Sequence, residues 1–120
     1  METETNPAKR ILLVEDERVM RELIRDLLVQ DEHIVVEANN GAEAYSLFTQ
    51  SQFDLVMTDC VMPFLNGDEL AIRIRQLAPR QPILMMTGYD FKCRPGSPVN
   101  AVLHKPFDYE LLQQEIAKLL

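Results

Sequence analysis

Short apolar runs recur along the chain, separated by longer segments in which apolar residues repeat at helical spacing. Three of these runs, bounded by small or polar residues, cover residues 11–14, 55–57 and 83–86. A strand that is covered on both faces need not alternate polar and apolar residues, so these runs predict buried strands. Residues 34–36 and 101–103 are weaker candidates of the same kind.

The segments between the predicted strands show the periodicity of helices. One apolar stripe along residues 17–30 consists of Val19, Met20, Leu23, Ile24, Leu27 and Leu28. Two more helices are expected to begin at Asn40 and Asn66, because each asparagine precedes a glutamate by three residues. Side chains at this spacing satisfy free backbone N–H groups at a helix start.

Apolar residues at helical spacing also mark the inner faces of the later helices. The second helix contributes Ala44, Leu47 and Phe48, the third Leu70, Ile74 and Leu77, and the last Leu112, Ile116 and Leu119. Asp108 is expected to cap the last helix. Pro79 and Pro82 prevent the third helix from continuing.

Strands that alternate with helices predict an α/β fold, here a doubly wound five-stranded parallel sheet with helices on both faces. The alternation fails over residues 88–104, where Pro95, Gly96 and Pro98 interrupt any helical pattern. We therefore expect a shortened or irregular fourth helix in that segment.

A chain of 120 residues has room for one domain, which we expect over residues 10–120 after an N-terminal tail over residues 1–9. Lys and Arg number 12 against 19 Asp and Glu, which gives a net charge of -7. This charge repels nucleic-acid phosphates and anionic membrane surfaces, so direct binding to either is disfavoured.

The two cysteines, Cys60 and Cys93, form no Cys-x-x-Cys pair, and residues 1–4 lack the basic start of a signal peptide. The longest aliphatic runs fall far short of the ~20 residues that a membrane-spanning helix needs. We expect a reduced, cytoplasmic chain that does not enter a membrane.

Polar side chains follow four of the predicted strands. Glu15 and Asp16 come after the first, Thr58 and Asp59 after the third, Thr87 after the fourth and Lys105 after the fifth. The carboxyl ends of parallel strands meet at one edge of the sheet, where ligands of such folds bind. Three carboxylates, a hydroxyl and an amine are therefore expected to share that edge.

Three crowded carboxylates repel one another unless a cation lies among them. Mg²⁺ prefers oxygen ligands, and one Mg²⁺ together with the Lys105 ammonium balances three carboxylates. A carboxylate can also act as a nucleophile that forms an acyl phosphate. Mg²⁺ and Lys105 would then neutralise a phosphoryl group, and Thr87 would donate a hydrogen bond to one of its oxygens.

This constellation resembles the receiver domain of CheY-like two-component response regulators, and the resemblance covers residues 10–120. The matching motifs are Glu15-Asp16, Asp59-Cys60-Val61-Met62-Pro63 followed by Asn66-Gly67, and Lys105-Pro106-Phe107. The resemblance implies a flavodoxin-like strand order of 2-1-3-4-5 and a cis bond between Lys105 and Pro106.

The resemblance also implies a role for each site residue. Asp59 would accept a phosphoryl group from a phosphohistidine of a sensor histidine kinase or a histidine phosphotransfer protein. Asp16 and Asp59 would bind Mg²⁺ directly together with the backbone carbonyl of Val61, and Glu15 would assist through water. Such a chain catalyses only its own phosphorylation and dephosphorylation, and it signals by changing how it binds an output partner.

The chain departs from the family pattern in three features: Val102, the interrupted segment over residues 88–104, and the pair Val61 and Tyr89. Val102 stands where receivers usually carry an aromatic residue that moves on phosphorylation, and Tyr89 is the candidate to replace it. Val61 offers no hydrogen bond to an attacking water, so slow hydrolysis of the phosphoryl group is expected.

Three other functions remain open on the sequence. A Mg²⁺-dependent phosphohydrolase with an aspartate nucleophile would need a second acid where Val61 stands. A flavin-binding module would need hydroxyl and amide groups after the first strand that donate hydrogen bonds to the flavin phosphate. Glu15 and Asp16 stand there and repel phosphate. A pseudo-receiver that binds partners without phosphorylation is favoured only by Val102.

Overall fold

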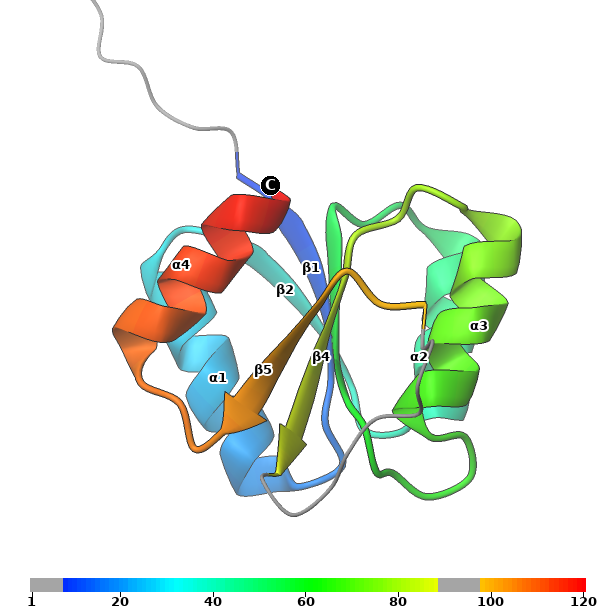
Figure 1. Ribbon diagram of the computed structural model, residues 1–120, viewed down its shortest axis with the longest axis horizontal. Helices are drawn as coiled ribbons and strands as arrows, with labels where there is room; N and C mark the ends of the chain where they lie inside the picture. The colour runs from blue at the N-terminus through cyan, green and yellow to red at the C-terminus, as the bar shows by residue number, and fades with distance from the viewer. Residues whose placement is uncertain (1–7, 89–97) are drawn as a thin grey trace, which may run out of the picture.

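Each predicted apolar run forms a strand in the computed structural model, which describes residues 8–88 and 98–120. The elements, in chain order, are β1 (Arg10–Val14), α1 (Arg18–Gln30), β2 (Ile34–Ala38), α2 (Gly41–Gln50), β3 (Leu55–Asp59), α3 (Gly67–Leu77), β4 (Ile83–Gly88), β5 (Ala101–Lys105) and α4 (Tyr109–Leu119). The strands pair in parallel in the order β2-β1-β3-β4-β5 (Figure 1), as expected.

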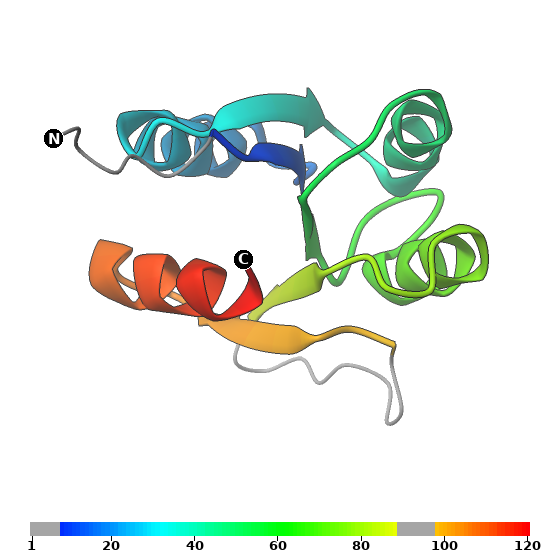
Figure 2. The ribbon, with the colours of Figure 1, turned by 90° about the horizontal axis from the view of Figure 1, so that it is seen from above.

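Helices cover both faces of the sheet. Figure 2 shows α1 and α4 on one side and α2 and α3 on the other. Alternate residues of a strand point to opposite faces. Accordingly, Ile11 and Leu13 of β1 pack in the cluster under α1 and α4, whereas Leu12 and Val14 pack in the cluster under α2 and α3. The strands are therefore apolar without alternation because each face has its own core.

Side-chain caps begin three of the four helices in the described part of the chain, at the residues expected. Asn40 accepts a hydrogen bond from the Glu43 amide at 2.8 Å, and Asn66 accepts one from the Glu69 amide at 3.0 Å. Asp108 caps α4 in the same way, through the Leu111 amide. The peptide bond between Lys105 and Pro106 is cis, which confirms that prediction.

The predicted inner face of α1 is partly wrong. Ile24 and Leu28 are buried, but the side chains of Val19 and Leu23 are 75% and 55% exposed. The buried face of α1 is thus turned away from the centre of the apolar stripe. Arg21 lies on the same face as Ile24 and Leu28 and donates to Glu37 and to the Glu15 carbonyl.

The predicted inner face of α3 is likewise too long. Leu70 and Ile74 are buried, whereas Leu77, the last residue of the helix, is 54% exposed. Leu77 therefore lies outside the core that Leu70 and Ile74 share with the sheet.

Three predictions fall wholly or partly outside the described residues. The segment predicted to hold a shortened or irregular fourth helix includes residues 89–97, which are not described, and Tyr89 is one of them. The tail predicted over residues 1–9 is described only from residue 8. These stay predictions. Residues 98–100 lead directly into β5, where the Asn100 amide donates to the Ile83 carbonyl at 2.8 Å.

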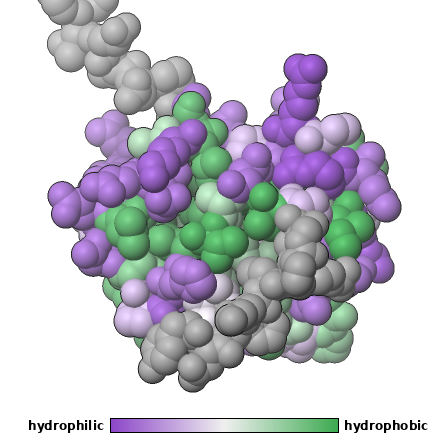
Figure 3. Space-filling view, viewed as in Figure 1, coloured by the Kyte–Doolittle hydropathy of each residue, from purple (hydrophilic) through white to green (hydrophobic). Residues whose placement is uncertain are grey.

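The face viewed in Figure 1 carries hydrophobic side chains in its middle, in front of β5 and beside α4, with hydrophilic side chains around them (Figure 3). Val102 in β5 and Leu111 in α4 are each 39% exposed. Among the helices of the described residues, none combines the length and the apolar character that crossing a membrane requires.

Candidate functional site

The strand ends bring the predicted site residues to one edge of the sheet. Val14 pairs with Thr58 in register, so Glu15 and Asp59, the next residue in each chain segment, lie side by side at the ends of β1 and β3. On the other side of β3, Thr87 is the last residue but one of β4, and Gly88 pairs with Lys105 at the end of β5.

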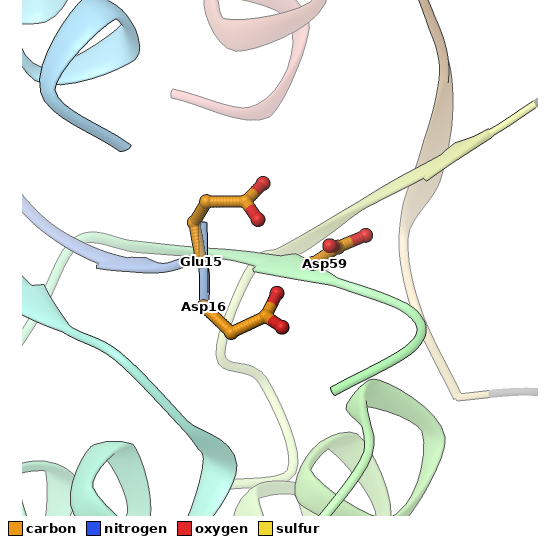
Figure 4. A group of neighbouring side chains, drawn as sticks. All are labelled: Glu15, Asp16 and Asp59. Atoms are coloured by element: carbon orange, nitrogen blue, oxygen red, sulfur yellow. The ribbon is translucent and has the colours of Figure 1, made fainter. Parts of the chain in front are cut away.

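Three carboxylates converge at this edge. One oxygen from each of Glu15, Asp16 and Asp59 lies within 4.8 Å of the others. Figure 4 shows the side chains of Glu15 and Asp16 extending from the end of β1 toward Asp59 at the end of β3. Glu15 is buried, Asp59 is half-buried and Asp16 is exposed, so a ligand can reach the cluster from the Asp16 side.

Lys105 joins the same cluster from β5. Its Nζ lies 2.8 Å from Oε1 of Glu15 and 3.4 Å from Oδ2 of Asp59. One ammonium group against three carboxylates leaves two negative charges when all are ionised. One divalent cation balances that charge, and carboxylate oxygens are the ligands that Mg²⁺ prefers, so the donor set fits this ion.

Burial and their mutual contact both shift the pKa values of Glu15 and Lys105. Burial raises the pKa of Glu15 to about 7, and the neighbouring Asp59 adds to the rise, although hydrogen bonds from Lys105 and the Glu17 amide oppose it. Burial lowers the pKa of Lys105, but the hydrogen bond and charge of Glu15 outweigh it, so this pKa is raised. Without a cation, Glu15 therefore holds a proton more readily than an ordinary glutamate does.

Backbone contacts fix the position of Asp59. The Cys60 amide donates to Asp59 Oδ1 at 2.9 Å, and the Gly67 amide donates to the Cys60 carbonyl at 2.8 Å. A Cβ at Gly67 would lie only 2.3 Å from the Asp59 carbonyl oxygen. Only glycine therefore lets the start of α3 approach the end of β3 this closely.

A second glycine holds the loop between β3 and α3 against α2. A Cβ at Gly41 would lie 2.1 Å from the Leu65 carbonyl oxygen. The side chains of Val61 and Phe64 on this loop are 55% and 88% exposed, and Phe64 has a φ of 71°. The loop thus keeps its position through backbone contacts while two of its side chains point into solvent.

Thr87 is buried beside the cluster, and its hydroxyl donates to the Gly88 carbonyl at 3.3 Å. Val61 lies two residues after Asp59, close enough along the chain for its backbone carbonyl to serve the same site. All six residues predicted for the site therefore lie at the carboxyl ends of the strands or on the loop that follows β3.

Sequence reasoning missed a group of charged residues behind the acids. Arg21 donates from Nη1 to the Glu15 carbonyl at 2.9 Å and from Nε to Glu37 Oε1 at 3.0 Å. Arg25 donates to the other oxygen of Glu37 at 3.2 Å. One signal for this group is Glu37, the single charged residue of β2, together with arginines beside the apolar stripe of α1.

A comparison with protein families matches residues 11–117 to the response regulator receiver domain. The chain is 40% identical over 116 residues to the response regulator receiver protein CpdR of Brucella abortus, with 93% of this chain and 97% of that protein covered. It is 34% identical over 117 residues to the chemotaxis protein CheY of Halobacterium salinarum, with 94% and 98% covered.

Solved structures agree with this match. The response regulator TrrA of Thermotoga maritima, in complex with Mg²⁺-BeF, superposes with a TM-score of 0.86 at 32% identity. The alignment covers 93% of this chain and 99% of TrrA. The flavodoxin-like fold expected from the sequence is therefore confirmed.

Proposed function

The chain belongs to the response regulator receiver domain family, and on that premise we propose that Asp59 is its phosphoacceptor. The observation that carries this proposal is the convergence of Glu15, Asp16 and Asp59 beside Lys105. An isolated acidic cluster of this kind is unfavourable, so a site that keeps it is suited to a cation and a phosphoryl group.

The proposed reaction is an exchange of one bond to phosphorus. A carboxylate oxygen of Asp59 attacks the phosphoryl group of a phosphohistidine, an O–P bond forms, and the N–P bond breaks with its electron pair returning to the imidazole. The Cys60 amide holds the carboxylate in place through Oδ1. Because the nucleophile is positioned before the donor arrives, little reorganisation is needed.

The site would hold Mg²⁺ through Asp16, Asp59 and the Val61 carbonyl, with Glu15 acting through water. When bound, the ion would neutralise charge on the carboxylates and the phosphoryl oxygens. TrrA, at 32% identity, was solved with Mg²⁺-BeF, which supports the assignment.

Lys105 and Thr87 would contact the phosphoryl group itself. The Lys105 ammonium, now 3.4 Å from Asp59, would pair with one phosphoryl oxygen, and the Thr87 hydroxyl would donate to another. These contacts stabilise a charge that develops during transfer, which is the main demand that phosphoryl transfer makes on a protein.

The chain would act as a switch and turn over no metabolite. We propose that it catalyses only its own phosphorylation and dephosphorylation, with a sensor histidine kinase or a histidine phosphotransfer protein as donor. The exposed, apolar Val61 supports slow hydrolysis of the phosphoryl group. A cytoplasmic location is proposed because Cys60 and Cys93 form no Cys-x-x-Cys pair. The net charge of -7 disfavours direct binding of nucleic acid.

A labelling experiment tests the proposal. Incubation with Mg²⁺ and acetyl phosphate should add one phosphoryl group per chain, measured as a shift in intact mass. Asp59→Asn should abolish the adduct, whereas Asp54→Asn, at the opposite end of β3, should leave it unchanged. Rapid release of inorganic phosphate in large excess over the chain, with no adduct that accumulates, would instead favour a phosphohydrolase. The absence of both an adduct and phosphate release would favour a pseudo-receiver.

A further inference from the structure

Asp16 differs from the other two acids in how it is held. Asp59 accepts the Cys60 amide, and Glu15 accepts both Lys105 and the Glu17 amide. Among the described residues, no hydrogen bond or ion pair reaches the exposed carboxylate of Asp16. Its place in the cluster therefore depends on the backbone that carries it.

The backbone just before Asp16 is held from two sides. The Glu15 amide donates to the Ala38 carbonyl of β2 at 3.1 Å, which continues the pairing of β1 with β2 beyond the last strand residue. The Glu15 carbonyl, which belongs to the peptide group joining it to Asp16, accepts Nη1 of Arg21 at 2.9 Å. A change in the ψ angle of Glu15 alone would move this carbonyl and swing the whole of Asp16 away from Asp59, and the bond to Arg21 opposes that change.

Arg21 is itself fixed in position. Its Nε donates to Glu37 at 3.0 Å, and Arg25 binds the second carboxylate oxygen of Glu37 at 3.2 Å. The Arg21 side chain is only 16% exposed, so little water competes for its donors. A planar guanidinium that binds a carboxylate and a carbonyl at once holds their relative geometry, because its donors form a rigid fork.

We propose that Arg21 is a positioning residue for the metal site, which acts by fixing the Glu15–Asp16 peptide so that the Asp16 carboxylate faces Asp59. This inference rests on the proposed function, since it assigns Asp16 as a Mg²⁺ ligand. Arg21 itself touches neither the ion nor the phosphoryl group.

The sign of the effect separates positioning from charge. A positive charge near a cation site repels the cation, so a role through charge alone predicts that removing Arg21 strengthens Mg²⁺ binding. A positioning role predicts the opposite, because a misplaced Asp16 loses contact with the ion. Loss of a partner that orients a metal ligand typically costs about 10- to 100-fold in metal affinity.

The experiment compares Arg21→Gln with Arg18→Gln by calorimetric titration of Mg²⁺ into the unphosphorylated chain. Both substitutions remove one positive charge from the start of α1, but within residues 8–88 and 98–120 the ion pair of Arg18 is with Glu22, one turn further along the same helix. Arg21→Gln should weaken Mg²⁺ binding by about tenfold or more. Arg18→Gln should leave the affinity within about twofold of the unchanged chain or strengthen it slightly.

A second readout follows the proposed contact directly. In the metal-free chain, Arg21→Gln should shift the backbone resonances of the Glu15 carbonyl carbon and the Asp16 amide nitrogen, which share the peptide group. Thermal unfolding without Mg²⁺ identifies any general loss of the fold. Arg21→Met, which keeps the apolar stem of the side chain, is the second variant and should weaken Mg²⁺ binding as Arg21→Gln does.

Each outcome decides the matter. If the unchanged chain binds no Mg²⁺ and forms no adduct, the proposed function fails. If it binds Mg²⁺ but a folded Arg21 variant binds equally well or more tightly, the positioning role is overturned while the function stands. Loss of the fold in both Arg21 variants would also overturn it, because Arg21 would then belong to the general framework.

Discussion

Charged groups are paired at the amino ends of the parallel strands and incompletely paired at the carboxyl ends. At the amino ends, the guanidinium of Arg10 donates to the Gln52 carbonyl and the Ser51 hydroxyl, both at 3.0 Å, and lies over the Phe53 ring. The Arg10 amide also donates to Asp54 at 2.8 Å. These donor groups of Arg10 are therefore paired with groups of neighbouring segments of the chain.

Arg75 makes the corresponding contacts at the amino ends of β4 and β5. Its guanidinium donates to the carbonyls of Pro79, Gln81 and Pro98 and to the side chain of Asn100, at 2.6 to 3.1 Å. The same Asn100 oxygen accepts the Ile83 amide at the start of β4. One cation therefore ties the end of α3 to the entries of β4 and β5.

At the carboxyl ends, acids outnumber the positive groups that reach them. Lys105 serves Glu15 and Asp59, and Asp16 has no such partner among the described residues. Polar groups that are satisfied internally contribute to stability, whereas incompletely paired ones leave free energy for a ligand to recover. The contrast teaches that one end of this sheet serves the fold and the other serves binding.

The largest expected effect comes from removing the least restrained acid. Asp16→Asn should weaken Mg²⁺ binding by about 100-fold, or about 2.7 kcal/mol, because the ion loses a charged ligand. Without Mg²⁺, the free energy of unfolding should fall by no more than about 0.5 kcal/mol, since the exposed Asp16 carboxylate has no hydrogen bond or ion pair to another described residue. Calorimetric titration and urea unfolding measure the two quantities. A loss of unfolding free energy as large as the loss of Mg²⁺-binding free energy would contradict the view that the carboxyl ends serve binding and the amino ends serve stability.

The opposite pattern is expected at Arg75. Arg75→Met should lower the free energy of unfolding by about 2 kcal/mol, because partly buried acceptors lose a charged donor. Urea unfolding measures this loss. Mg²⁺ affinity should remain within about twofold, since the residue lies at the other end of the strands. A parallel fall in Mg²⁺ affinity would show that the two ends are coupled.

A smaller loss is expected at Arg10, whose contacts are more exposed. Arg10→Gln should cost about 1 kcal/mol in urea unfolding, from lost hydrogen bonds and the lost contact with the Phe53 ring. The Arg10 amide still donates to Asp54 in this variant. A loss as large as that at Arg75 would mean that exposure does not set the difference between the two arginines.

The smallest effect is expected at Val19, three residues beyond Asp16 in the chain. Val19→Ser should change the free energy of unfolding by less than about 0.5 kcal/mol, because its side chain is 75% exposed. Ile24→Ser on the buried face of α1 is the matched control and should destabilise strongly. Thermal unfolding measures both variants. Similar destabilisation of the two would show that Val19 lies on the buried face of α1, as the apolar stripe predicted.

Much of the site could be predicted because its chemistry follows from strand ends. An acid directly after a buried strand must lie at the carboxyl edge of a parallel sheet, so Glu15, Asp16 and Asp59 could be brought together without coordinates. The caps at Asn40 and Asn66 were equally predictable, since they depend on residues three positions apart.

The rest depended on contacts that sequence spacing does not encode. Periodicity located the apolar stripe of α1 but not its rotation, which brings Arg21 toward Glu37 on a strand 16 residues away in the chain. The role of Gly67 was also beyond prediction. Its approach to the Asp59 carbonyl follows from the packing of α3 against β3, and glycine is common near turns whether or not another segment packs closely against it.

The exposed Phe64 offers a practical opening for fluorescence spectroscopy. The chain contains no tryptophan, so Phe64→Trp would introduce its single indole on the loop that follows Asp59. Gly41 and Gly67 hold this loop through main-chain contacts, so a larger ring that points into solvent need not disturb it. Emission from that one fluorophore would report events at the acidic edge in real time, without a radioactive label or a partner protein.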